Sequence, residues 1–188
     1  MKALKYIFIF LLISITSQAQ EHFVDKKKNN LVKFISKTPI ESFEGITNQI
    51  DGYMYWEGDN LTNKSQLYFE VNLDALDTGI GLRNRHMKEN YLETFRYPYA
   101  QFNGKVVNEE KISDNKSKVT VDGEMFIHGV AKKITVQGTI EKNKPSYRIQ
   151  TDFIIKLSDY KIEIPSLMFM RISEDIKLVL DFYIKEKN

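Results

Sequence analysis

The feature that most constrains the fold of this chain is a regular alternation of apolar and polar side chains. Between Gln66 and Leu73 every second residue is apolar, beginning at Leu67 and continuing through Phe69 and Val71. This period of two is typical of β-strands that bury one face. The alternation recurs in four later segments, at residues 119–127, 134–140, 149–157 and 176–184.

Three weaker strand candidates, at residues 31–36, 50–57 and 99–107, bring the predicted number of strands to about eight. Short polar turns such as residues 142–145 join neighbouring strands, which favours antiparallel pairing in chain order. Such a meander buries its apolar face by closing into a barrel or by folding into a sandwich. The pattern favours the barrel.

One segment breaks the alternation and has the spacing of a helix. Apolar residues recur at helical spacing within residues 84–95, namely Met87, Tyr91, Leu92 and Phe95. We expect a helix there that lies over one end of the barrel, with Asn84 as its N-cap and Pro98 preventing its continuation. A shorter helical turn is expected after Thr38-Pro39, because proline suits the first helical position, with Gly45 ending it.

The first nineteen residues have the successive parts of a removable secretory signal. Lys2 and Lys5 flank the start of an apolar run over residues 6–15, and Ser17-Gln18-Ala19 offers small residues for cleavage. The run is shorter than the about 20 apolar residues that a membrane-spanning helix needs. The sequence therefore predicts an exported protein, periplasmic or secreted, with no transmembrane anchor and with residues 20–188 as one domain.

The predicted mature chain is close to electrically neutral. The formal net charge of +2 falls to zero on cleavage, because the signal segment holds two lysines and no acidic residue. A neutral surface has no electrostatic footprint for nucleic acid, so no nucleic-acid partner is expected. The chain has no cysteine, so an exported form would depend on its hydrophobic core rather than on disulfides.

Three polar segments lie at the ends of predicted strands, where binding sites are more frequent than in strand interiors. The first holds Asp77-Thr78-Gly79 followed by Arg83 and His86. The second is Ile127-His128-Gly129-Val130, and the third runs over residues 158–165, beginning Ser-Asp-Tyr. In this order and spacing the three segments resemble the YceI family of exported lipid-binding and polyisoprenoid-binding barrels. The resemblance spans residues 23–184.

The resemblance implies an all-β fold, an antiparallel up-and-down lipocalin-like β-barrel of about eight strands with a short helix covering one end. It implies that the interior binds, sequesters or transports an isoprenoid or similar long-chain lipid, without catalysis. The chain departs from the family at Asn84, where the family usually has aspartate after the arginine. That amide replaces a carboxylate that would orient His86 or pair with Arg83.

If the family's function holds, inward-facing apolar side chains line the cavity. A lipid tail would then be held by burial of its methylene groups, each contributing about 0.8 kcal/mol. The competing interpretation is an ordinary packed core. The predicted lining residues are Phe69, Val71, Phe102, Met125, Ile127, Phe153, Ile155, Leu180 and Phe182.

Four polar residues are candidates for contacts with a ligand head group near the barrel mouth: Arg83, His86, His128 and Asp159. Arginine presents a planar fork that suits phosphate or carboxylate, and a neutral histidine donates to a carbonyl or phosphate oxygen. The alternative is that they satisfy backbone groups where strands end, with His128 holding a turn and Asp159 capping backbone donors.

A run of large apolar residues before the last strand is a candidate gate over the barrel end. Methionine suits a surface that must repack. The competing interpretations are a strand extension and a plug in the core. The run comprises Leu167, Met168, Phe169 and Met170.

No metal site, cofactor or catalytic centre is expected. The chain lacks His-x-x-x-His, Cys-x-x-Cys and Gly-x-Ser-x-Gly spacings. Two other functions stay open, an enzyme or tailoring factor acting on such a lipid, and a filled-barrel stress-response module acting through its surface. A homodimer formed through an open strand edge near Tyr99 also stays open.

Overall fold

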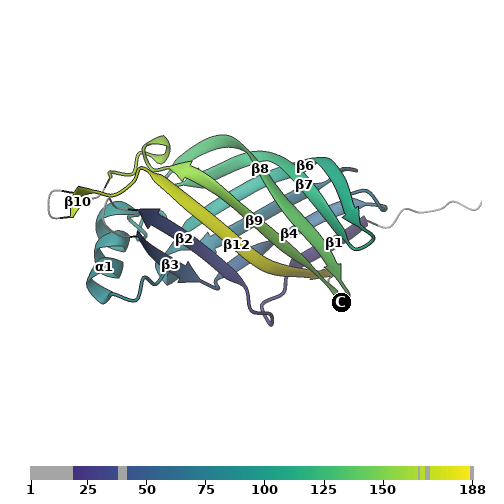
Figure 1. Cartoon of the computed structure of the whole chain (residues 1–188), viewed down its shortest axis with the longest axis horizontal. Helices are drawn as coiled ribbons and strands as arrows, with labels where there is room; N and C mark the ends of the chain where they lie inside the picture. The colour runs from purple at the N-terminus through teal and green to yellow at the C-terminus, as the bar shows by residue number, and fades with distance from the viewer. Residues whose placement is uncertain (1–18, 38–41, 165, 168–169, 187–188) are drawn as a thin grey trace, which may run out of the picture.

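The computed structural model describes residues 19–37, 42–164, 166–167 and 170–186. It is an all-β structure in which eight antiparallel strands close into a barrel, so the predicted fold class is confirmed. The barrel is elongated, with α1 at one end and the C-terminus at the other (Figure 1). Around the ring the strands are β1 (Ala19–Val24), β4 (Ile50–Glu57), β5 (Gln66–Asn72), β6 (Tyr99–Ser113), β7 (Lys116–Ile127), β8 (Val130–Asn143), β9 (Ser146–Lys156) and β12 (Asp175–Glu186).

Every strand predicted from the alternation coincides with an observed strand, apart from Leu73 and Leu157, each of which lies one residue past a strand end. On β7, for example, Met125 and Ile127 are buried, whereas the alternating residues Glu124 and Phe126 are exposed. The alternation did not reveal β1 or β3 (Ser42–Thr47), which are short and carry glutamate or glycine among few apolar residues. The predicted signal segment lies outside the described residues, apart from Ala19 at the start of β1.

One edge of β12 serves two partners and so closes the barrel. Residues 177–181 pair with β2 (Leu31–Lys37), and residues 184–186 pair with β1. The strand β2 is therefore an addition beside the ring, and β1 completes it.

The turn between β1 and β2 fills the gap between these two pairings. The Asp25 amide donates to the Tyr183 carbonyl (2.7 Å), and the Tyr183 amide donates to Asn30 Oδ1 (3.0 Å). The buried Asp25 carboxylate is paired with Lys185 at 3.1 Å. Burial opposes ionisation of Asp25, but the hydrogen bonds from Lys185 and the Lys27 amide outweigh it and hold its pKa below the usual value.

At the α1 end, the β2–β3 hairpin extends the wall. The outer strand β3 reaches the segment after β5 through a bridge between Ile46 and Asp77, made of two backbone hydrogen bonds of 2.9 Å. The predicted helical turn ending at Gly45 is wrong for residues 42–45, which belong to β3, and residues 38–41 lie outside the described part. Pairing with β2 overrides the local proline signal there.

The predicted helix exists but begins earlier than expected. It consists of α1 (Gly81–His86) and the π-helical η2 (Met87–Tyr91), so Asn84 lies inside the helix and is not its N-cap. The Asn84 side chain is instead bonded to the segment before the helix. Among the described residues, no helix has the length and apolarity needed to cross a membrane.

The strands β8 and β9 are paired over only part of their length. The two strands pair only from Gly138 to Asn143 on β8, although both are fully described and β8 starts at Val130. Toward α1 the edges are joined by side chains, with a Lys132–Asp159 ion pair of 3.0 Å, and by η3 (Ser158–Tyr160), which follows β9. We call the unpaired stretch, residues 130–137 against 152–156, the β8–β9 seam.

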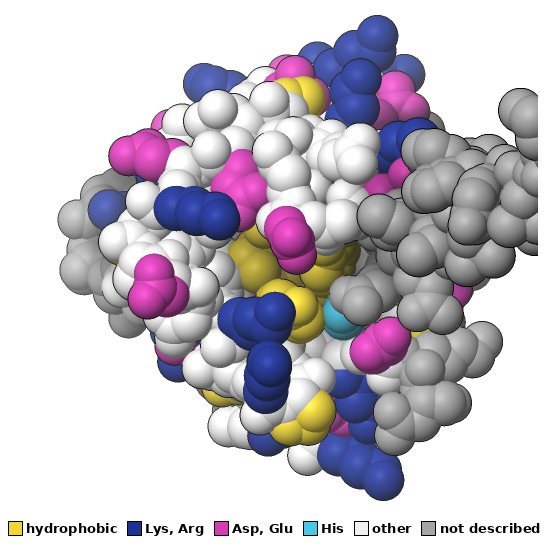
Figure 2. Space-filling view, turned by 90° about the vertical axis from the view of Figure 1, so that its right-hand side faces the viewer, with side chains coloured by type: hydrophobic (Ala, Val, Ile, Leu, Met, Phe, Trp, Pro, Cys, Tyr) yellow, Lys and Arg dark blue, Asp and Glu magenta, His cyan; other side chains and the backbone are white. Residues whose placement is uncertain are grey.

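Two buried apolar clusters lie inside the barrel. The cluster toward the C-terminal end includes Met54, Trp56 and Ile184, and the cluster next to η3 includes Ile127 and Tyr160. Figure 2 looks onto the C-terminal end, where hydrophobic side chains are recessed at the centre and charged side chains surround them.

Candidate functional site

The residues predicted to line the cavity fall into two groups by burial. Met125, Ile127, Ile155 and Phe182 are buried members of the two clusters. The others are partly buried and pack against these clusters: Phe69, Val71 and Leu180 against the first, Phe153 against the second, and Phe102 against both. We call these five residues the middle layer.

Two inward aromatic rings lie close to a glycine of a neighbouring strand. A Cβ built on the glycine would lie 2.2 Å from the Phe34 ring at Gly45 and 2.5 Å from the Phe102 ring at Gly123. At Gly52, which has a positive φ of 133°, the nearest atom to such a Cβ would be the Tyr68 carbonyl oxygen at 2.0 Å, and a Phe69 ring atom would lie at 2.9 Å. Phe34 and these glycines were not among the residues predicted from sequence, although an isolated glycine in a strand often marks such a close approach.

The first polar motif, Asp77-Thr78-Gly79, is joined to α1 by side-chain hydrogen bonds. Asp77 Oδ1 accepts hydrogen bonds from Asn84 Nδ2 (2.7 Å) and from the Gly79 amide (2.8 Å). Asn84 Oδ1 in turn accepts from the hydroxyl and the amide of Thr78, at 2.6 and 2.8 Å. The bond from Asn84, followed by that from Gly79, holds the pKa of Asp77 below its usual value. Asn84 thus has a structural role for which its neutral amide is suited.

Arg83 projects from α1 over the β2–β3 hairpin. Its guanidinium Cζ lies 4.6 Å from the centre of the Phe43 ring, and Nη2 donates to the Thr78 carbonyl at 2.7 Å. Its Nε is buried, and no hydrogen-bond partner for it occurs among the described residues.

His128 connects three segments at the α1 end. It sits in the turn between β7 and β8 with a positive φ of 50°, and its side chain is 12% exposed. Nε2 lies 2.8 Å from Glu93 Oε2, Nδ1 lies 3.2 Å from the Tyr160 carbonyl, and the ring packs edge-on against Tyr97. Both polar partners are acceptors, so a neutral ring satisfies one of them. These contacts fit the structural alternative for His128.

The remaining two head-group candidates are exposed. His86 lies on α1, and Asp159 pairs with Lys132 across the β8–β9 seam. No hydrogen bond or ion pair among the described residues joins any two of Arg83, His86, His128 and Asp159. The structure places all four at the α1 end without bringing them into one cluster.

The candidate gate lies in a small hairpin outside the barrel sheet. Leu167 of β10 (Ser166–Leu167) is paired with Met170 of β11 (Met170–Arg171). Met168 and Phe169 lie outside the described residues, so the gate stays a prediction.

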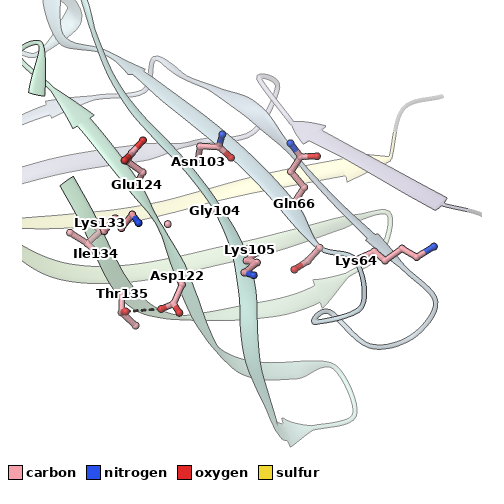
Figure 3. A pocket seen from close by; sticks show the side chains of 12 residues that line it. Lys64, Gln66, Asn103, Gly104, Lys105, Asp122, Glu124, Lys133, Ile134 and Thr135 are labelled. Carbon is pink, nitrogen blue, oxygen red and sulfur yellow. Dashed lines mark hydrogen bonds between the residues drawn. The ribbon is translucent and has the colours of Figure 1, made fainter. Parts of the chain in front are cut away.

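Two shallow grooves lie on the outside of the barrel. One, of about 900 Å³, crosses the outer face of β5 to β8, and Figure 3 shows its mixed polar lining, including the hydrogen bond from Thr135 to Asp122. The other, of about 780 Å³, lies beside α1 and is lined by Arg85, Lys88 and Phe95 among others. Within the described part of the chain, no group of three or more His, Asp or Glu side chains is placed to hold a metal ion.

Solved structures share this fold at low sequence identity. BcnA from Burkholderia cenocepacia is 19% identical with a TM-score of 0.70, covering 85% of this chain and 98% of its own. A polyisoprenoid-binding domain from Saccharophagus degradans, implicated in plant cell wall breakdown, is 16% identical with a TM-score of 0.68, covering 90% and 100%. A YceI protein from Campylobacter jejuni is 23% identical with a TM-score of 0.58, covering 77% and 85%.

A comparison with curated proteins found no match. The model of the YceI-like domain matches residues 23–184, nearly the whole of the described barrel. The chain therefore belongs to the YceI family.

Proposed function

We propose that this protein binds an isoprenoid or a similar long-chain lipid inside its barrel and sequesters or carries it without chemical change. The observation that carries the proposal is the middle layer, five apolar side chains that pack against the two buried clusters and yet remain partly exposed. Apolar surface left open in an interior is the usual lining of a ligand cavity. Membership of the YceI family and the likeness to a polyisoprenoid-binding domain support a binding protein rather than an enzyme.

The energetics favour a ligand with a long tail. Each methylene buried against the middle layer contributes about 0.8 kcal/mol, so a tail of several isoprene units needs few polar contacts. The predicted signal segment fits a lipid carrier that works in an exported compartment.

Filling the middle layer tests the proposal. Val71→Phe adds volume on the inner face, and Ile154→Phe is the matched control because Ile154 is 64% exposed. If the interior is open, V71F folds with stability within about 1 kcal/mol of wild type but loses affinity for a prenyl lipid, measured by calorimetric titration. If the barrel is already filled, V71F is destabilised by about 1–3 kcal/mol and wild type takes up no lipid.

A further inference from the structure

The outer face of the barrel carries a row of aromatic and polar side chains that leads into the larger of the two grooves. The row follows the antiparallel register from β1 to β8 with one residue on each strand, and cross-strand partners project from the same face of a sheet. Because neighbouring strands lie about 4.8 Å apart, the row spans about 24 Å. We call these residues the outer row: Phe23, Tyr53, Tyr68, Asn103, Glu124 and Lys133.

Three aromatic rings form one end of the outer row. The ring centres of Phe23 and Tyr53 are 6.3 Å apart, and those of Tyr53 and Tyr68 are 6.2 Å apart with their planes 33° from one another. All three rings are partly exposed, and the core lies on the other face of these strands, where Met54 and Leu67 are buried. Such cross-strand pairs stabilise a sheet, and they also present flat apolar surfaces on which a ligand can stack.

The other end of the outer row lies in the groove of about 900 Å³ that crosses β5 to β8. Figure 3 shows Gln66, Asn103 and Glu124 pointing the same way from three neighbouring strands. Asn103 is the cross-strand partner of Tyr68, so the groove begins beside the last aromatic ring. Within the described part of the chain, no side-chain hydrogen bond or ion pair engages Gln66, Asn103 or Glu124. Their donors and acceptors are therefore available to a ligand.

The hollow has a local cause in the backbone, since the outer surface of a barrel is otherwise convex. At the floor of the groove Gly104 of β6 is paired with Gly123 of β7, and the register of β6 shifts after Val106. A Cβ at Gly104 would lie 2.7 Å from the Asp122 carbonyl oxygen, so this close approach of the strands requires glycine. Paired glycines and a bulge let a sheet bend sharply, and bulges recur beside binding sites.

The lining of the groove selects the chemistry of its ligand. Amide, carboxylate and ammonium groups predominate, with Ile134 as the one large apolar residue among those that line it, so an apolar ligand would be poorly held. Three lysines face Asp122 and Glu124, and this near balance of charge favours a neutral ligand. A sugar ring has an apolar face of C–H groups and a rim of hydroxyls. It therefore matches aromatic rings that are followed by amides and carboxylates.

We propose that the outer row binds a neutral oligosaccharide. Sugar rings stack on Tyr53 and Tyr68, and the hydroxyls of the next sugars exchange hydrogen bonds with the Asn103 amide and donate to the Glu124 carboxylate. The site lies outside the barrel, so the oligosaccharide and the lipid of the proposed function bind independently.

Calorimetric titration of the mature protein with four neutral hexasaccharides tests this site, using the β-1,4-linked chains of glucose, xylose, mannose and N-acetylglucosamine. Wild type is expected to bind at least one of them with a Kd below about 1 mM. Tyr68→Ala should weaken that binding at least about tenfold, whereas Tyr68→Phe keeps the ring and should keep the affinity. Glu124→Ala should weaken it about threefold. Tyr99→Ala is the matched control, since Tyr99 is an exposed tyrosine of β6 outside the outer row.

The outcomes separate this site from the barrel interior. Failure of wild type to bind any of the four hexasaccharides overturns the proposal and leaves the aromatic rings with a role in the sheet alone. Equal affinity of wild type, Y68A and E124A assigns the binding elsewhere and overturns it as well. If Y68A does not fold, E124A and Asn103→Ala decide, because both positions are exposed and unchanged affinity in both contradicts the site. V71F should leave oligosaccharide binding unchanged and Y68A should leave prenyl-lipid binding unchanged, so either function can fail without the other.

Discussion

His128 lies in the β7–β8 turn and connects it to two other segments. Its ring contacts Glu93, which follows η2, and the carbonyl of Tyr160 in η3. Replacing it with asparagine keeps a residue that tolerates the positive φ of this turn but removes both long-range polar contacts. We expect H128N to lower the free energy of unfolding by about 1–3 kcal/mol, measured by urea denaturation. His86→Asn, on the exposed side of α1, should be neutral. Equal stability of H128N and wild type would contradict the bridging role.

Gly45 lets the Phe34 ring lie against the wall of the barrel. In Gly45→Ala the new Cβ would come within 2.2 to 3.0 Å of three atoms of that ring, all in the side chain, so the ring must move off the wall. We expect G45A to weaken prenyl-lipid binding by about tenfold, because the displaced ring occupies lumen that the tail uses. The double variant G45A/F34L should recover binding, and failure to recover would show that the backbone of β3, not the ring, is disturbed.

The polar motifs were recognisable from sequence, but their partners were not. Asp77, Arg83 and His128 stood out because they interrupt alternating strands. The partners of His128 give no such signal, since Glu93 and the Tyr160 carbonyl are distant in the sequence and reach it only in the folded chain. The role of Asn84 was also hidden, because its bonds to Asp77 and Thr78 form only after the helix starts at Gly81.

At the level of elements, the β8–β9 seam should be the least protected part of the barrel wall. Amides of residues 130–137 that point toward β9 have no strand partner, whereas residues 138–143 are paired with it. Unpaired edges open more easily, so these amides should exchange at least about tenfold faster in hydrogen–deuterium exchange followed by NMR. Uniform protection along β8 would show that the seam closes in solution.

Strands were easier to predict than the boundaries of helices. Long alternating segments such as β7 and β12 carry their own signal, because one face is buried along most of their length. The strand β3 carries little signal, since Gly45 and Glu44 interrupt it and its place is set by pairing with β2. The start of α1 was misplaced for a similar reason, because Ile80 at its N-cap makes no side-chain capping bond.

At the level of the whole molecule, the buried Asp25 carboxylate makes closure of the barrel sensitive to acid. The folded-state pKa of Asp25 is lowered, so its contribution to stability is present above the unfolded value of about 3.9 and is lost as pH falls through the folded pKa. We expect Asp25→Asn to be less stable than wild type at pH 7, with a smaller further loss below about pH 4. Asp114→Asn, in the exposed β6–β7 turn, is the control. Parallel profiles of stability against pH for D25N and wild type would contradict the role of Asp25 in acid sensitivity.

The central claim is that the barrel interior holds a lipid, and native mass spectrometry of the protein purified from its own exported compartment tests it most directly. The account predicts a mass above that of the mature chain, and organic extraction should release one isoprenoid class. A mass equal to the bare chain, together with no uptake of added prenyl lipids, would contradict the account and indicate a barrel filled by its own side chains.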